Sequence, residues 1–235
     1  MRGSAPRPTR WCSHRRSAGT IGFAQESGFR VLRRSFLPPI PEHALAADLL
    51  SQAADALLRG DAAECNRCLR AADLRALRDF SYLVCGPINP SIHRQAKNPV
   101  YDRSCVRPGP RMPSKAVELD IYARDGWRCR YCASRVILKQ ARKRFVKADP
   151  VAARWGRTNE EKHSGLATLT ASIDHVVPFM RGGDNQPRNL VTACGPCQFG
   201  RNQWLLFEVE IADPRDFPPI VDDWDGLSRL LGKSA

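Results

Sequence analysis

The sequence predicts an α+β fold, in which a small domain with two short strands follows a helical region. Apolar residues recur at helical spacing between residues 43 and 77. Further along, residues 169–177 and 190–192 contain Thr, Ile and Val and are separated by a glycine-containing stretch, which is typical of two strands joined by a turn. Two Cys-x-x-Cys pairs flank the predicted strands: Cys129 with Cys132, and Cys194 with Cys197.

The 235 residues divide into four predicted segments. The chain begins with an Arg- and Ser-rich stretch that lacks apolar periodicity, which favours disorder, although an organellar transit peptide has a similar composition. Prolines later interrupt the chain before the strand-containing domain and favour an extended linker. The segments are a disordered basic tail (1–40), a helical hairpin region (41–84), a Pro-rich linker (85–113) and the α+β domain with a C-terminal extension (114–235). In the extension, four apolar residues are expected to dock on the domain: Trp224, Leu227, Leu230 and Leu231.

The helical region is predicted to be an αα-hairpin. Its first helix covers His43–Leu58, where leucines and alanines fall on one face. Gly60–Asp61 breaks this helix, and a second helix is expected over Ala62–Leu77. These helices are a candidate docking surface for a protein partner.

A second group of possible metal ligands lies in this region. Cys65 and Cys68 form another Cys-x-x-Cys, and Cys85 and His93 could complete a zinc site. Both members of the pair fall inside a helical pattern, where a small apolar side chain packs well. We therefore predict that Cys65 and Cys68 belong to the core.

Composition narrows the class of protein. Lys and Arg exceed Asp and Glu by 13, and the sequence pI is near 9.8, which either marks a surface that binds polyanions or only keeps the chain soluble. The nine cysteines are an odd number and four of them form zinc-type pairs, so a reducing cytoplasm is expected rather than a disulfide scaffold. No apolar run suits a signal peptide or a membrane span.

The strand-containing domain begins with a predicted helix from Ser114, a suitable N-cap residue, to about Tyr122. Asp125–Gly126 ends this helix just before the first cysteine pair. Two Cys-x-x-Cys pairs offer four thiolates to one ion, and four protein ligands leave no open position for water or substrate. The sequence therefore predicts one structural zinc ion.

A second metal site is suggested by adjacent Asp174 and His175, near the end of the first predicted strand. A carboxylate suits a hard ion such as Mg²⁺ or Mn²⁺, and a histidine that titrates near neutrality suits a general base. These are the parts that phosphodiester hydrolysis needs, because a water must be activated while charge builds on phosphate.

Taken together, these residues resemble the HNH endonucleases, a ββα-metal nuclease family, in the subgroup with a four-cysteine zinc knuckle. The resemblance covers roughly Lys115 to Asp216 and does not extend to the N-terminal hundred residues. It is carried by four elements in the family's order: Asp174-His175-x-x-Pro178, Gly182-Gly183, Asn189-Leu190-Val191 and Cys194-x-x-Cys197.

The resemblance implies roles for individual residues. Asp174 would bind the catalytic ion with a residue on the final helix, which is expected within the segment from Cys194 to about Val209, while His175 activates water. Asn189 matches the family's middle Asn, whose amide bonds the loop backbone and holds the histidine in place. The sequence departs from the pattern after the fourth cysteine, where Gln198 stands in place of the usual His or Asn.

Two further positions on this helix have implied roles. Arg201 matches a usual Lys or Arg of the family and would clamp a phosphate. Asn202 is the alternative metal ligand if Gln198 points away.

Basic residues are candidate contacts to DNA. A helix-like basic run, Leu138–Lys147, lies between the first cysteine pair and Asp174. It either lies against phosphates or is a solvated face, and phosphate contact is favoured inside a nuclease-like domain. The basic residues of the Pro-rich linker leave the same two possibilities open. The predicted nucleic-acid-binding residues are Lys139, Arg142, Lys143, Arg144, Arg181 and Arg201.

The sequence thus predicts a DNA endonuclease with one structural zinc ion and one catalytic Mg²⁺ or Mn²⁺ ion. The alternative is a non-catalytic, zinc-bound nucleic-acid-binding module on a degenerate HNH scaffold, in which Gln198 has cost the protein its catalytic ion. A scaffold protein in a larger phage or mobile-element assembly is a third possibility.

Overall fold

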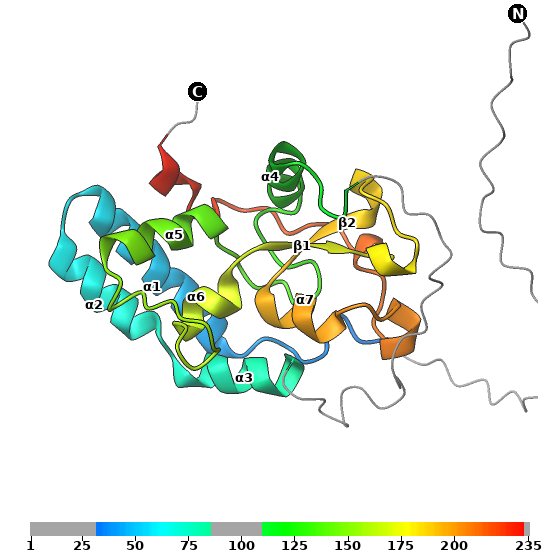
Figure 1. The fold of residues 1–235 in the computed structure, drawn as a ribbon, viewed down its shortest axis with the longest axis horizontal. Coiled ribbons are helices and arrows are strands. Elements are labelled where there is room, and N and C mark those ends of the chain that lie inside the picture. The colour runs from blue at the N-terminus through cyan, green and yellow to red at the C-terminus, as the bar shows by residue number, and fades with distance from the viewer. Residues whose placement is uncertain (1–31, 86–109, 233–235) are drawn as a thin grey trace, which may run out of the picture.

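The computed structural model describes residues 32–85 and 110–232 (Figure 1). Most of the predicted basic tail and of the Pro-rich linker, with His93, lies outside the described residues. Within them, no helix is both long enough and apolar enough to cross a membrane.

The described residues form an α+β fold, as predicted, with seven α-helices and one two-stranded antiparallel sheet. The helices are α1 Pro41–Leu58, α2 Ala62–Ala72, α3 Arg75–Cys85, α4 Lys115–Arg124, α5 Lys139–Ala148, α6 Ser164–Leu169 and α7 Gly195–Arg201. The strands are β1 Ser172–His175 and β2 Leu190–Ala193. Short 3₁₀ helices cover Phe179–Arg181, Pro187–Asn189, Leu206–Val209, Pro214–Asp216 and Ser228–Leu231.

The N-terminal helices differ in part from the predicted hairpin. Helices α1 and α2 pack together around a turn at Gly60, whose φ of +77° suits glycine, and Asp61 caps α2 by accepting a hydrogen bond from the Glu64 amide. The predicted second helix, Ala62–Leu77, is wrong at its end. It stops at Ala72, and a separate helix, α3, begins at Arg75.

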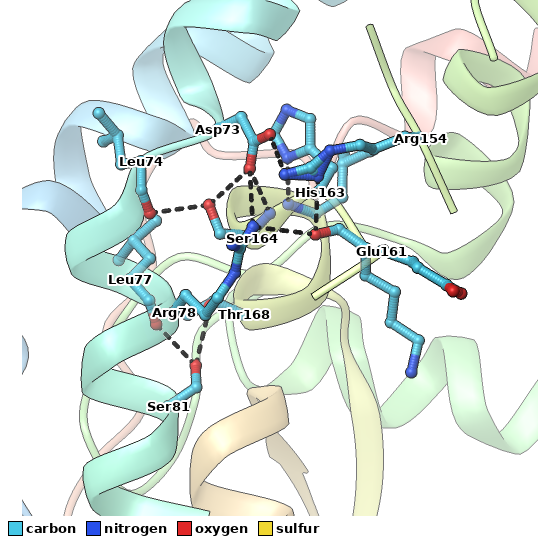
Figure 2. Close-up of polar contacts among 12 residues, drawn as sticks. Asp73, Leu74, Leu77, Arg78, Ser81, Arg154, Glu161, His163, Ser164 and Thr168 are labelled. Carbon is cyan, nitrogen blue, oxygen red and sulfur yellow. Dashed lines mark hydrogen bonds and ion pairs between the residues drawn. The ribbon is translucent and has the colours of Figure 1, made fainter. Parts of the chain in front are cut away.

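The break between α2 and α3 is held by a polar junction with α6 (Figure 2). Asp73 accepts hydrogen bonds from the backbone amide of Ser164 (2.7 Å) and from its hydroxyl (2.9 Å), and it pairs with Arg154 at 2.6 Å. The Ser164 hydroxyl also donates to the Leu74 carbonyl at 2.8 Å. These partners come from the domain that follows the linker, so the N-terminal helices pack directly against that domain. The buried apolar residues of both regions form one core.

His163 completes this junction. Its side chain is fully buried; Nε2 lies 2.7 Å from the Leu69 carbonyl, and Nδ1 accepts a hydrogen bond from the Leu166 amide at 3.1 Å. A carbonyl can only accept, so Nε2 carries the proton and the imidazole is neutral. Burial lowers the pKa of His163 below its ordinary value.

The hairpin and the helix that follows it lie to the right of α1 and α2 in Figure 1, and α7 packs against α3. Strands β1 and β2 pair antiparallel, with Asp174 opposite Val191 and His175 opposite Leu190. The first strand is shorter than the predicted 169–177: α6 ends at Leu169, Thr170 forms an isolated bridge with Ile137, and β1 runs only from Ser172 to His175. The final helix predicted within residues 194–209 is α7, which ends where Asn202 adopts a φ of +49°.

Other elements follow the prediction. Helix α4 is capped by the Ser114 hydroxyl and packs on β2, and the basic run forms α5. Of the C-terminal residues expected to dock, Trp224, Leu227 and Leu230 are buried, and the Trp224 indole donates to the Val136 carbonyl at 2.8 Å. Leu231 was also expected to dock, but its side chain is 38% exposed.

Candidate functional site

The four cysteines predicted to bind zinc come together in the structure. The Sγ atoms of Cys129, Cys132, Cys194 and Cys197 lie within 4.8 Å of one another, and all four residues are buried. Zn–S bonds of about 2.3 Å place the sulfurs of a tetrahedral site about 3.8 Å apart. The Sγ atoms of Cys132 and Cys194 are 3.7 Å apart. The donor set therefore fits a structural metal ion such as zinc.

The backbone arranges these sulfurs in two different ways. In the first pair, Cys129 donates its amide to the Ser134 carbonyl and accepts from the Ala133 amide, which closes a tight turn with Ala133 at a φ of +63°. The second pair uses a helix start, because Cys194 is the N-cap of α7 and Cys197 lies in its first turn. By contrast, Cys65 and Cys68 are buried away from this group, as predicted, and belong to the core.

The thiols of this group influence one another strongly. Hydrogen bonds to its sulfur, first from Cys129 and then from Cys194 and Cys197, hold the pKa of Cys132 well below its ordinary value. Hydrogen bonds with Cys129 and Cys132, together with burial, raise the pKa of Cys194 and Cys197. One thiolate is therefore favoured by the cysteines alone, and a bound dication would favour the thiolate form of all four.

Asp174 lies next to this centre, but its carboxylate is fully engaged. Oδ2 accepts hydrogen bonds from the Tyr131 hydroxyl at 2.6 Å and from Nε of Arg201 at 2.5 Å. Oδ1 accepts from Nη2 of Arg201 at 2.8 Å. Because Tyr131 belongs to the first cysteine turn and Arg201 to α7, this carboxylate joins the two parts of the structure that supply the cysteines.

Arg201 does not face solvent, so the expectation that it clamps a phosphate does not match its position. Its side chain is 1% exposed and pairs with both oxygens of Asp174. It also donates to the backbone carbonyls of His175, Val176 and Trp204. A guanidinium has five N–H groups, and each has an acceptor here.

The two predicted ligands of the catalytic ion, Asp174 and Gln198, have separate hydrogen-bond partners in the structure. The amide nitrogen of Gln198 donates to the Ile173 carbonyl at 3.2 Å, and no hydrogen bond joins Gln198 to Asp174. The alternative ligand, Asn202, is exposed. Since Arg201 places a positive charge on the only carboxylate of this group, the residues do not fit a bound Mg²⁺ or Mn²⁺ ion.

His175 is held in a defined orientation. Its Nε2 lies 2.8 Å from the amide oxygen of Asn185, and its ring meets that of Phe179 edge to face, with centroids 6.0 Å apart. Asn185 in turn donates to the Pro110 carbonyl at 2.6 Å. The imidazole is 8% exposed, so little of it reaches the surface.

Asn189 ties down the loop that follows His175. Its amide oxygen accepts from the Val177 amide at 2.8 Å, and its nitrogen donates to the carbonyls of Val177 (3.1 Å) and Asp184 (2.9 Å). Gly183 packs against the same loop, where an added Cβ would lie 1.7 Å from the Val177 oxygen. These are the backbone contacts that the resemblance implies for Asn189, while its part in catalysis stays a prediction.

The predicted DNA-binding residues fall into two groups. Lys139, Lys143 and Arg144 are exposed on α5, and Arg142 of the same helix lies over the Trp155 ring at 3.7 Å. Arg181, however, is mostly buried and pairs with Glu208 at 2.8 Å. Arg181 and Arg201 are thus committed to partners within the protein.

Sequence reasoning missed two residues of the site. Tyr131 stands inside the first Cys-x-x-Cys, a position that faces the hairpin, yet nothing local shows that its hydroxyl reaches Asp174. Asp125, predicted only to end a helix, is buried and accepts a hydrogen bond from the Thr192 amide at 2.7 Å. Both residues contact β1 or β2 from the segment around the first cysteine pair.

Comparison with family models, with curated proteins and with solved structures found no match for this chain.

Proposed function

We propose that this chain is a DNA-binding protein whose β-hairpin and α7 are stabilised by zinc on a scaffold that resembles the HNH nucleases. The observation that carries the proposal is the cationic surface of α5. Lys139, Lys143 and Arg144 are exposed on one helix, and none of them pairs with a carboxylate among the described residues. In a chain with a net charge of +13, such a surface suits the phosphates of nucleic acid.

The position of Arg201 favours binding over hydrolysis. A hard cation needs oxygen ligands that are free to coordinate, but both oxygens of Asp174 accept hydrogen bonds from Arg201. To bind an ion there, the protein would have to break the buried, bidentate ion pair between Asp174 and Arg201. The remaining N–H groups of Arg201 also have acceptors, so they provide no reason for the side chain to move away. The four-cysteine centre has no such conflict.

A binding experiment tests the main proposal. We expect a fluorescein-labelled 20-base-pair DNA duplex to bind with an affinity that falls steeply as salt rises. Replacing Lys143 and Arg144 by Glu should weaken binding and lower the salt dependence, since each lost phosphate contact reduces the logarithmic slope by about 1. The matched control is Arg70→Glu on α2. Equal affinity of the two variants, or salt-independent binding, would reject the proposal.

A metal-dependent endonuclease is the second candidate, and one specific observation favours it. His175 follows the metal-ligand position of the family, and Asn185 and the loop held by Asn189 keep its ring oriented. In hydrolysis, His175 would accept the proton of a water whose oxygen attacks phosphorus, and the bond to the 3′ oxygen would break. The observed Asp174–Arg201 pair provides no site for the ion that this reaction uses.

Supercoiled plasmid separates the two candidates. The protein is incubated with plasmid in Mg²⁺, in Mn²⁺ and in EDTA, with His175→Ala alongside. The binding proposal expects bound but uncut plasmid in each case. Metal-dependent cleavage that His175→Ala abolishes would establish the second candidate instead.

A further inference from the structure

A cavity of about 660 Å³ lies among α3, α5, α6 and α7, on the part of the molecule that also carries the basic helix α5. Its walls are rich in cations, since Arg78, Lys139, Arg142 and Lys162 all line it. None of the described residues that line it is Asp or Glu. A cavity of this size is in the usual range for a small ligand, and its lining selects an anion.

Among the described residues, Arg142 has no acidic partner, and Arg78 has only a long ion pair with Asp73. Arg142 is half-buried against the Trp155 ring, and burial lowers the pKa of its guanidinium. No carboxylate pairs with it in the described part of the chain. Nε of Arg78 is buried without a hydrogen-bond partner, and its nearest carboxylate oxygen, on Asp73, is 3.9 Å from Nη2. The unpaired Nε of Arg78 costs free energy, and the charge of Arg142 has no counter-charge, so both groups favour a ligand with acceptor oxygens.

The same cavity offers aromatic faces. Phe199 lines it from α7 with a side chain that is 69% exposed, and Tyr82 lines it from α3 with 36% exposed. A large exposed aromatic residue on a cation-lined wall is typical of proteins that stack the bases of a single strand. Gln198 and Asn202, whose metal roles found no support, also line the cavity and offer amide groups to a base edge.

We infer that this cavity binds an unpaired nucleotide of a DNA strand, with the phosphate on Arg78 and Arg142 and the base stacked on Phe199. The inference rests on the proposed DNA-binding function and specifies what one part of the surface recognises. A paired base in a duplex has its faces covered by its neighbours, so only an unpaired base can stack in the cavity. The protein should therefore prefer single-stranded or gapped DNA to an intact duplex.

The test compares variants that differ only in whether the altered residue lines the cavity. Fluorescence anisotropy is measured for a labelled 20-nucleotide oligothymidine and for a 20-base-pair duplex at fixed salt. Phe199→Ala is paired with Phe207→Ala, because both side chains are highly exposed and only Phe199 lines the cavity. Lys139→Ala is paired with Lys143→Ala on the same helix for the same reason.

We expect Phe199→Ala to weaken oligothymidine binding by about 5- to 150-fold, the range for losing one base-stacking aromatic. Phe207→Ala should leave it unchanged, and duplex binding should respond little to either variant. Lys139→Ala should weaken oligothymidine binding more than Lys143→Ala does. Circular dichroism of each variant confirms that it is folded.

Each other outcome has a distinct meaning. If the wild type binds duplex and oligothymidine equally and Phe199→Ala matches Phe207→Ala, the inference about the cavity is wrong while DNA binding stands. If neither DNA binds at physiological salt, the proposed function fails and the inference fails with it.

Discussion

The four-cysteine centre and the Asp174 site lie side by side, were predicted from adjacent motifs, and yet differ in how far the structure agrees with the prediction. The cysteine sulfurs are close enough to share one ion. The Asp174 carboxylate instead forms a buried ion pair with Arg201. The difference teaches that a metal site is predicted more reliably from two ligands whose spacing is fixed by a short turn than from a single ligand whose partners come from distant parts of the chain.

Breaking the cysteine centre should have the largest effect. Cys194→Ser removes one of four ligands from a centre that joins α7 to the segment after α4, so we expect loss of zinc and a fall in the free energy of unfolding on the order of 5 kcal/mol or more. Cys85→Ser is the control, because Cys85 is half-buried outside the centre. Elemental analysis should find one zinc per wild-type chain and per Cys85→Ser chain. If Cys194→Ser and the wild type unfold at the same temperature, the cysteine centre does not stabilise the fold.

Breaking the ion pair between Asp174 and Arg201 should have the second-largest effect on the free energy of unfolding. Arg201→Met leaves the Asp174 carboxylate buried without a counter-charge, which commonly costs about 3–5 kcal/mol. The double variant with Asp174→Leu also removes the stranded charge and should recover much of that loss. Chemical denaturation of both variants and of the wild type measures this coupling. If Arg201→Met alone is as stable as the wild type, the ion pair of Arg201 with Asp174 does not stabilise the fold.

The same ion pair can be used to sharpen the functional comparison. If Arg201 alone keeps a divalent ion from Asp174, Arg201→Ala should create weak Mg²⁺ or Mn²⁺ binding that Asp174→Asn abolishes. Because the variant loses stability, the titration should be done well below its unfolding temperature, with calorimetry as the readout. Equal metal binding by wild type and Arg201→Ala would show that the pair does not control the ion.

The sequence predicted those features whose cause is local. The Ser114 cap, the extent of α5 and the spacing within each cysteine pair depend on neighbouring residues, and the structure contains all of them. It could not predict that Arg201 turns inward, because the Asp174 carboxylate and the His175 and Val176 carbonyls that orient it lie 25–27 residues away in the chain. For the same reason the break at Asp73 was missed, since the residues that satisfy its carboxylate, Arg154 and Ser164, follow more than eighty residues later.

A smaller effect is expected from Asn189, which stiffens the loop beside the Asp174 site. Asn189→Ala leaves backbone groups of Val177 and Asp184 without their partner, and we expect a loss of about 1–3 kcal/mol. Hydrogen exchange should increase at Val177 while the cysteine centre stays protected. Asn159→Ala, at an exposed position, is the control and should change stability by about 0.5 kcal/mol or less. Unchanged exchange at Val177 would argue against a role for Asn189 in ordering the loop.

The smallest effect concerns His163, in a third buried polar group that resembles the Asp174 site because its partners also come from afar. Its folded-state pKa is lowered by burial, whereas the unfolded chain should titrate near the ordinary value of about 6.5. Below that pH the unfolded chain takes up a proton that the folded protein resists, so the stability is complete above about pH 6.5 and declines as the pH falls, by at most about 1.4 kcal/mol per pH unit.

His163→Asn removes the titrating group and keeps an oxygen that can accept from the Leu166 amide, so it should be less stable at pH 8 and have a flatter profile between pH 5.5 and pH 7. Denaturant unfolding across that range, with zinc content checked at each pH, tests this. Parallel profiles for the two proteins would mean that His163 titrates alike in both states and that the junction tolerates its charge.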